Sequence, residues 1–354
     1  NNEMLELFQA AHSGAPADGE LSSAKRSFRI DRVTLSGQRE PVFIQKAERT
    51  FGEEETQLEA VVEHLEAHFR ESGIEPLPGI CLPALESVIP YKALLRERKG
   101  HGCPVPLGVL DDPANQRQEE VLLDLAGGNL FVLGSALMGK TSLLQTLLRS
   151  IGEGYAPDEV SVYILDFAAM ALKVFEDMPH VGGVVSPADD ERLKTLFRMM
   201  GKEVQHRKER FSQIGISSYT GYREAGNRDL PFIVLMIDNF AALRSQYEEY
   251  DDALLSLCRE GPTVGISLVV TAQQTTGIGY RYLSTFGNRV SLHCNDSGEY
   301  TALFDRSRLQ PGNLPGRGLV ALDKVVYEFQ AYLGFEGDKE IERVKSVRDF
   351  VQAC

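Results

Sequence analysis

From about residue 101 onward, short apolar runs alternate with longer amphipathic stretches. The apolar runs are rich in Val, Ile and Leu and cover residues 130–133, 161–165, 232–237, 267–270 and 289–293. Helical periodicity fills the segments 140–151, 189–213 and 253–259. Short, continuously apolar strands separated by helices are typical of a parallel sheet that is covered on both faces. Two further runs, 318–322 and 325–333, predict an antiparallel addition that closes this sheet.

The first hundred residues follow a different pattern. Two short strands are predicted at 28–35 and 41–45, and apolar residues at helical spacing predict an amphipathic helix over 53–71. A connection rich in Pro and Gly comes next, and we place a boundary near residue 100. The sequence therefore predicts a small flanking α+β segment over residues 1–100 and a larger α/β domain over residues 101–354.

A glycine-rich loop lies between the first predicted strand of the larger domain and the helix that follows it. Gly134 is followed by four residues and then by Gly139, Lys140 and Thr141. Glycines let the backbone N–H groups surround phosphates, the lysine reaches phosphate oxygens, and the threonine hydroxyl is a Mg²⁺ ligand. The candidate ATP-binding residues are Gly134, Ser135, Ala136, Leu137, Met138, Gly139, Lys140, Thr141 and Ser142. The order strand, loop, helix predicts a RecA-like P-loop NTPase domain, whereas an incidental glycine-rich turn is the alternative.

A second component of the site is predicted at the end of another strand. Asp238 terminates the apolar run 232–237, at the sheet edge where ligands of open α/β sheets bind. We expect it to hold Mg²⁺ through water, with helix capping as the alternative. Asp166 ends a second strand and either assists the metal or water, or starts a turn. Asn239 stands where ATPases usually carry a catalytic Glu, and an amide cannot accept a proton at neutral pH. Because such a loss costs on the order of 10²–10⁴ in rate, the sequence predicts binding more firmly than turnover.

The composition narrows the range of functions. The formal net charge is -14, with no block rich in Lys or Arg, so a basic track for DNA or RNA is not expected. Five scattered cysteines fit reduced thiols and argue against a disulfide framework or a thiolate zinc site. No apolar run reaches the length of a membrane span. The chain begins without Met, so we expect a fragment of a longer protein, and any membrane anchor would lie in the part outside this sequence.

Taken together, the motifs resemble the FtsK/SpoIIIE superfamily of translocase ATPases. Within it, the chain looks like a C-terminal ATPase module, the third, of the EssC/EccC type VII secretion ATPases. The stretch from Pro106 to Gln118 resembles the segment that precedes the family's P-loop, and the stretch from Gly265 to Gln273 resembles its sensor strand. The resemblance implies that Gln273 senses the γ-phosphate and that Gln118 approaches the adenine. The family's Arg near Pro262 is absent, and such a group is worth roughly 10³–10⁵ in rate.

The resemblance also implies a biological setting. We expect an ATP-binding module, weakly or not hydrolysing, of a membrane-anchored protein secretion motor on the cytoplasmic side of the bacterial cell membrane. Its partners would be neighbouring ATPase modules of the same polypeptide and WXG-type secreted substrates, with docking or regulation as its role. It would be a monomer in isolation and part of a hexamer in the full machine. The alternative is an active, DNA-translocating ATPase like others of the superfamily.

Overall fold

A computed structural model describes residues 28–45, 56–73, 81–92, 102–305, 307–337 and 339–354. The chain divides into two units, the first ending at Ile80 and the second running from Cys81 to Cys354.

The first unit contains the two strands and the helix that the sequence predicts. Strand β1 (Phe28–Val33) pairs antiparallel with β2 (Arg39–Gln45), and the rings of Phe28 and Phe43 lie 5.5 Å apart. Helix α1 (Gln57–Glu71) begins after Thr56, whose side chain and that of Glu59 form a reciprocal capping box. This cap explains the start at Gln57. The predicted helix residues 53–55 lie outside the described part of the chain.

The second unit is built on one large mixed sheet. Its order is β5-β4-β13-β12-β11-β6-β10-β9-β7-β8, and β3 pairs with β13. The strands from β11 to β8 are parallel, and those from β12 to β5 are antiparallel. The strand bounds are β3 (Ile89–Pro90), β4 (Pro104–Asp112), β5 (Arg117–Asp124), β6 (Leu130–Leu133), β7 (Val160–Asp166), β8 (Val181–Val185), β9 (Phe232–Asp238), β10 (Ile266–Ala272), β11 (Asn288–Leu292), β12 (Arg317–Leu322) and β13 (Val325–Leu333).

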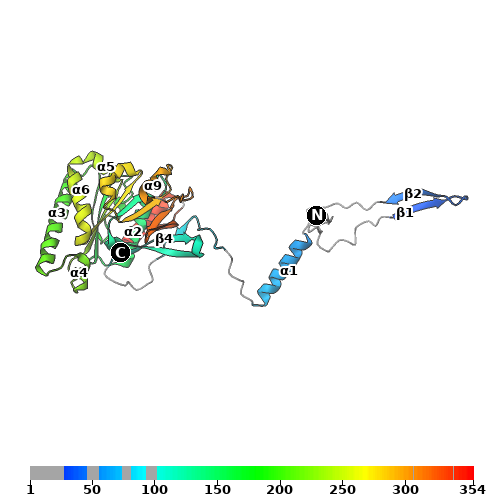
Figure 1. The fold of residues 1–354 in the computed structure, drawn as a ribbon, viewed down its shortest axis with the longest axis horizontal. Helices are drawn as coiled ribbons and strands as arrows, with labels where there is room; N and C mark the ends of the chain where they lie inside the picture. The colour runs from blue at the N-terminus through cyan, green and yellow to red at the C-terminus, as the bar shows by residue number, and fades with distance from the viewer. Residues whose placement is uncertain (1–27, 46–55, 74–80, 93–101, 306, 338) are drawn as a thin grey trace, which may run out of the picture. The chain divides into compact units, whose positions relative to one another are not determined.

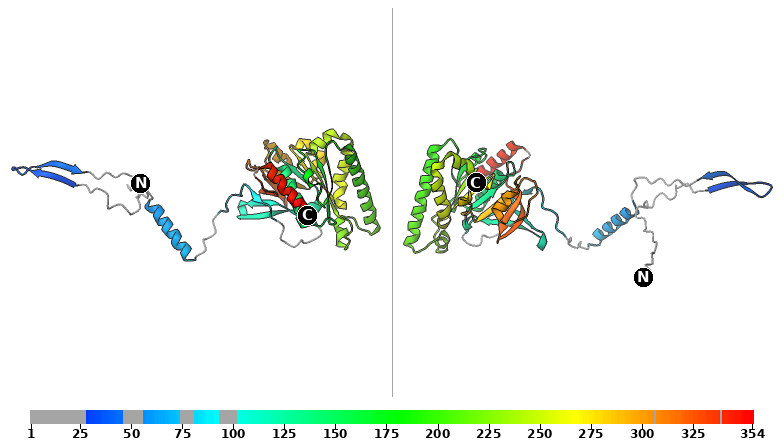
Figure 2. Two further views of the ribbon diagram at one scale, coloured as in Figure 1. Left: turned by 180° about the vertical axis from the view of Figure 1, so that it is seen from behind. Right: turned by 45° about the horizontal axis from the view of Figure 1, so that its top comes forward.

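The helices of the second unit pack around its sheet (Figure 1). Their bounds are α2 (Lys140–Gly154), α3 (Asp190–Gln213), α4 (Tyr219–Glu224), α5 (Phe240–Gln246), α6 (Asp251–Glu260), α7 (Thr275–Ile278), α8 (Tyr280–Leu283), α9 (Gly298–Phe304) and α10 (Glu340–Ala353). Short 3₁₀ turns are η1 (Pro113–Asn115), η2 (Leu125–Gly127), η3 (Lys173–Phe175), η4 (Glu248–Tyr250) and η5 (Gly261–Val264). Helix α6 packs on β10 and against α3, whereas α10, red in Figure 2, lies apart from α3 in both views.

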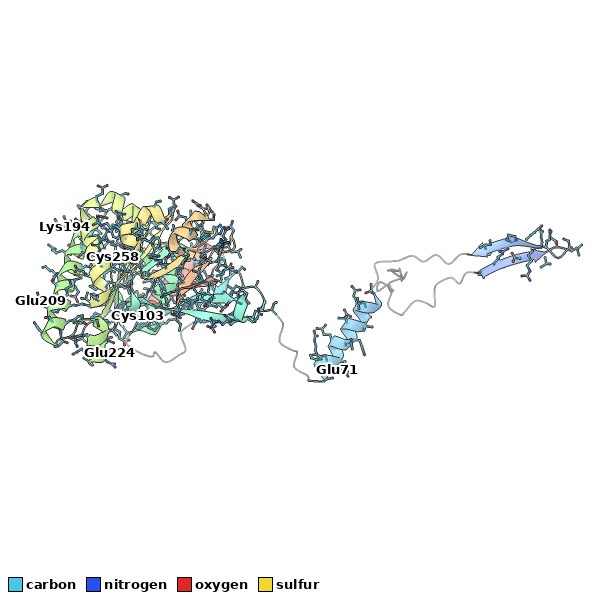
Figure 3. All side chains as sticks on the ribbon, viewed as in Figure 1. Glu71, Cys103, Lys194, Glu209, Glu224 and Cys258 are labelled. Atoms are coloured by element: carbon cyan, nitrogen blue, oxygen red, sulfur yellow. The ribbon has the colours of Figure 1, made fainter. Side chains whose placement is uncertain are left out.

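Burial confirms the α/β architecture predicted from the apolar runs. Every residue of β6, β9 and β10 is buried, as expected for strands that are covered on both faces. Helix α3 turns its apolar residues inward, while Lys194 and Glu209 extend from its exposed side (Figure 3). None of the five cysteines, all within the described ranges, forms a disulfide. None of the helices in the described ranges is long and apolar enough to cross a membrane.

The start of the second unit bears on the predicted boundary near residue 100. That boundary falls at residues 93–101, outside the described part, and stays a prediction. Residues 81–92 nevertheless pack on the sheet of the second unit, to which they belong, because β3 pairs with β13 and the backbone N–H of Tyr91 donates to Leu333 O at 3.0 Å. We call residues 81–92 the connector. It lies across the antiparallel half of the sheet.

Candidate nucleotide-binding site

The glycine-rich loop lies between β6 and α2, as the sequence predicts. Strand β6 is fully buried, and α2 begins at Lys140. Two residues adopt left-handed backbone conformations, Leu137 with φ 64° and Gly139 with φ 98°. No side chain caps the first turn of α2. Its amide groups therefore face the loop at the positive end of the helix dipole, an arrangement that suits an anion.

The loop is held in shape by backbone contacts from three directions. Gly134 N donates to Ala272 O at 3.1 Å, and Ser135 N donates to His293 O at 3.0 Å. On the other side, Gly316 N donates to Met138 O at 3.0 Å. The remaining predicted loop residues lie at the surface or half-buried: Ala136 and Leu137 are exposed, and Ser142 is half-buried. The ends of β10 and β11 and the residue before β12 thus fix the loop.

The Lys140 ammonium group is directed into the loop. Its Nζ donates to Gly134 O and to Ser135 O, both at 2.8 Å. Burial lowers the pKa of Lys140 from its ordinary value, and the nearby Asp238 carboxylate acts in the opposite direction. The charge is therefore held at the centre of the loop.

Thr141 and Asp238 meet at the carboxyl edge of the sheet. Thr141 Oγ1 donates to Asp238 Oδ2 at 2.7 Å, although the two residues are 97 positions apart in the sequence. Asp238 is 1% exposed and ends β9, which is separated from β6 only by β10. The structure thus brings together Thr141 and Asp238, the two residues that the sequence predicts to hold Mg²⁺.

The donor set fits Mg²⁺. A hydroxyl and a carboxylate are hard oxygen donors, and Mg²⁺ is usually held by one or two carboxylates together with substrate phosphates. Within the described ranges, no group of three or more His, Cys, Asp or Glu side chains could hold a metal by itself. Thr141 and Asp238 would hold Mg²⁺ together with a bound nucleotide, where the ion would neutralise phosphate charge.

Asn239 directly follows Asp238 and has an unusual backbone. Its φ of 67° lies in the left-handed region, where Asn is tolerated better than most residues. The side-chain Nδ2 donates to Phe167 O at 3.1 Å, and the backbone N donates to Thr271 Oγ1 at 2.9 Å. The amide is thus engaged with the end of β7.

Asp166 is a turn-forming residue. Its carboxylate accepts from the backbone N–H groups of Ala168 at 3.2 Å, Met170 at 3.2 Å and Leu172 at 2.9 Å. Burial raises the pKa of Asp166, and these three amides act against that shift. Of the two interpretations left open above, the turn is the one that the contacts support.

The two glutamines named by resemblance lie in different parts of the fold. Gln273 is the first residue after β10, exposed, at the same sheet edge as the loop and Asp238. Gln118 lies on β5, and β4, β13, β12 and β11 separate that strand from β6. Its Nε2 donates to Pro83 O at 2.8 Å and to Asp111 Oδ1 at 3.1 Å. Gln118 therefore holds the connector, and its predicted contact with adenine stays a prediction.

Two sets of contacts that matter here were not predicted. Thr271, on β10, donates to Asp238 Oδ1 at 2.5 Å. Arg317 follows Gly316 and donates to Leu85 O at 2.8 Å and Glu86 O at 3.2 Å in the connector. A threonine within an apolar strand carries no local signal of function, and the Arg317 contacts join residues far apart in the chain.

Comparison with known proteins identifies relatives for this arrangement. The profile of the FtsK/SpoIIIE family matches residues 104–306. The ESX secretion system protein EccC of Geobacillus thermodenitrificans is 30% identical over 351 residues, which are 98% of this chain and 23% of that protein. The chain thus spans about a quarter of the length of such curated relatives.

Solved structures agree with this comparison. ATPases 2 and 3 of EssC from Geobacillus thermodenitrificans align with a TM-score of 0.71 at 27% identity, covering 77% of this chain and 52% of that one. ATPases 2 and 3 of Thermomonospora curvata EccC, in complex with a signal sequence peptide, give 0.65 at 26% identity, covering 77% and 50%. The family profile spans more than half of the chain, including the P-loop, Asp238 and Gln273. The chain belongs to the FtsK/SpoIIIE family.

Proposed function

We propose that this chain binds ATP together with Mg²⁺ at the loop formed by residues 134–142. The observation that carries the proposal is the 2.7 Å hydrogen bond between Thr141 and Asp238, beside the uncapped first turn of α2. The loop amides and Lys140 would bind the phosphates, Thr141 and Asp238 would hold the ion, and Gln273 would lie near the γ-phosphate. Membership of a P-loop ATPase family supports the same assignment.

The proposed site turns ATP over slowly or not at all. The position after Asp238 holds an amide that bonds to Phe167 O, so no carboxylate there can accept a proton from water. The position of the family's Arg is Pro262, within η5 before β10. Each missing group is worth several orders of magnitude in rate.

The proposed setting is type VII protein secretion. The relatives named above are secretion proteins, and one was solved with a signal sequence peptide. We extend this to a docking or regulatory role toward WXG-type secreted substrates, with neighbouring ATPase modules of the same polypeptide as partners. The proposal includes a membrane-anchored machine, on the cytoplasmic side of the bacterial cell membrane, in which the modules assemble as a hexamer while this chain alone is a monomer.

A thermal melt tests nucleotide binding directly. ATP–Mg²⁺ at about a hundred times its dissociation constant stabilises a fold by about 2.7 kcal/mol, so the midpoint of the wild-type chain should rise. Lys140→Ala removes the central ammonium and should abolish the rise, whereas Lys194→Ala, on the exposed side of α3, should retain it. An equal response in wild type and Lys140→Ala, or none in wild type, would refute the proposal.

Active DNA translocation is the competing function. It predicts robust ATP turnover that double-stranded DNA stimulates. The formal net charge of -14 argues against this function, because DNA is also negatively charged. We expect turnover to stay low and unchanged when DNA is added, measured as phosphate release at low salt, where phosphate contacts are strongest.

A further inference from the structure

Thr271 lies at the point where β10 runs beside the end of β9. Strand β10 stands between β6 and β9, so Thr271 is placed between the strand that leads into the P-loop and the strand that ends in Asp238. Its side chain is completely buried. It is two residues before Gln273, at the same edge of the sheet.

The direction of each hydrogen bond at Thr271 is fixed by chemistry. The backbone N–H of Asn239 can only donate, and it does so to Thr271 Oγ1 at 2.9 Å. A hydroxyl has a single proton, and the Thr271 proton points to Asp238 Oδ1 at 2.5 Å. The chain of donation runs from Asn239 through Thr271 to Asp238.

Asp238 is therefore held by two hydroxyls. Thr141 donates to Oδ2 and Thr271 donates to Oδ1, so each carboxylate oxygen has one side-chain donor. A buried carboxylate with both oxygens engaged has one preferred orientation, and its remaining lone pairs stay available in fixed directions. A fixed orientation of the carboxylate that holds the ion through water matters for Mg²⁺ in particular, because this ion requires near-ideal octahedral geometry and keeps several waters.

We propose that Thr271 is a positioning residue that sets the Mg²⁺ dependence of nucleotide binding, by holding the Asp238 carboxylate in the orientation that the ion requires. The inference rests on the proposed ATP–Mg²⁺ site. It predicts different effects on nucleotide binding in the presence and in the absence of Mg²⁺. Loss of the Thr271 hydroxyl weakens binding of nucleotide with Mg²⁺ and leaves binding of nucleotide without Mg²⁺ unchanged, since the Lys140 ammonium group donates to Gly134 O and Ser135 O and makes no hydrogen bond to Thr271.

The same strand offers a matched control. Ser267 is also completely buried on β10, and its Oγ donates to Gly128 O at 3.1 Å, at the opposite edge of the sheet. Ser267→Ala removes a buried hydroxyl from β10 without touching the loop or Asp238. Thr271→Val keeps the shape and removes the hydroxyl, and Thr271→Ser keeps the hydroxyl.

The experiment is calorimetric titration of ATP into the full chain, over a series of Mg²⁺ concentrations and in EDTA. Mg²⁺ raises the affinity for ATP, and we compare the Mg²⁺ concentration that gives half of this increase. For Thr271→Val this concentration should be about tenfold higher than for the wild type, which is the effect expected from losing one hydrogen bond to a charged group. Its affinity in EDTA should match the wild type. Thr271→Ser and Ser267→Ala should match the wild type under both conditions.

Wild-type Mg²⁺ dependence in a folded Thr271→Val protein would overturn the inference and leave the proposed function standing. A wild-type chain that binds no ATP would instead remove the proposed function itself, and the inference with it. If Thr271→Val fails to fold, Thr271→Cys, with a weaker donor of similar size, replaces it. Wild-type Mg²⁺ dependence in Thr271→Cys would likewise overturn the inference.

Discussion

At the scale of single residues, some groups of the site could be predicted from the sequence and others could not. Lys140, Thr141 and Asp238 were predicted because each stands at a fixed place in a local pattern, and the structure brings the last two into hydrogen-bond contact. Thr271 was not predicted, because a β-branched residue in an apolar strand is ordinary on sequence grounds. Asn239 was predicted for its chemistry, but only the structure shows that its backbone is left-handed.

The backbone of Asn239 leads to a prediction about stability. Its φ of 67° favours Asn or Gly, and a Glu in that conformation is strained by about 1 kcal/mol. Asn239→Glu should therefore lower the free energy of unfolding by about 1 kcal/mol relative to Asn239→Gly, which loses the same side-chain bond to Phe167. Urea unfolding of both variants measures the difference. Equal stabilities would show that the left-handed conformation carries no cost here.

The pKa of Lys140 leads to a prediction about pH. Burial holds the folded-state pKa below the ordinary 10.5, so the unfolded chain binds more protons between these two values. The free energy of unfolding of the wild type should therefore rise relative to Lys140→Met as the pH increases toward 10.5. Denaturant melts of both proteins from pH 7 upward, without nucleotide, test the sign. A difference that stays constant with pH would contradict it.

At the scale of elements, the parallel half of the sheet was largely predictable and the other half only partly so. Continuous apolar runs marked β6, β7, β9, β10 and β11, whereas β8 in the parallel half and β4 and β5 in the other half were not predicted as strands. In β5, Arg117, Glu119 and Glu120 interrupt the apolar pattern, because the strand lies at the edge of the sheet. Its identity is set by pairing with β4, which no local pattern of residues encodes.

Arg317 joins the connector to the P-loop side of the sheet. Besides its bonds to Leu85 O and Glu86 O, its Nε donates to Gln330 Oε1 at 2.8 Å. Arg317→Lys keeps the charge but cannot reach all of these acceptors. We expect it to lower the free energy of unfolding by about 2 kcal/mol, since buried acceptors lose their donors.

Hydrogen exchange gives this prediction its second measurement. Amides of the connector, such as that of Tyr91, should exchange faster in Arg317→Lys than in the wild type. Arg281→Lys is the control, because its side chain is 57% exposed and pairs with Asp252 at the surface. That variant should stay within about 0.5 kcal/mol of the wild type. Unaltered exchange at the connector would argue against the proposed anchoring.

At the scale of the whole molecule, the two units predict where the chain can be shortened. The second unit begins at Cys81 and has its own core, so a chain starting there should unfold at the same temperature as the complete chain. A chain starting at His101 lacks the connector, and with it β3 and the carbonyl oxygens of Leu85 and Glu86 that accept from Arg317. It should unfold roughly 3 °C lower, as expected for a loss of about 1–2 kcal/mol in a domain of this size. Calorimetry of all three chains distinguishes a boundary at residue 80 from one near residue 100.

The position of β5 has a consequence for how this molecule meets others. An edge strand has unpaired backbone N–H and C=O groups with which a strand of another chain could pair, and many proteins prevent this pairing with charged side chains. An added strand would have to desolvate the charged side chains of Arg117 and Glu119. It would also have to displace the connector, which Gln118 holds through its hydrogen bond to Pro83 O. Addition of a strand to β5 is therefore disfavoured. Contacts between modules at this edge would be made by side chains and not by backbone hydrogen bonds between strands.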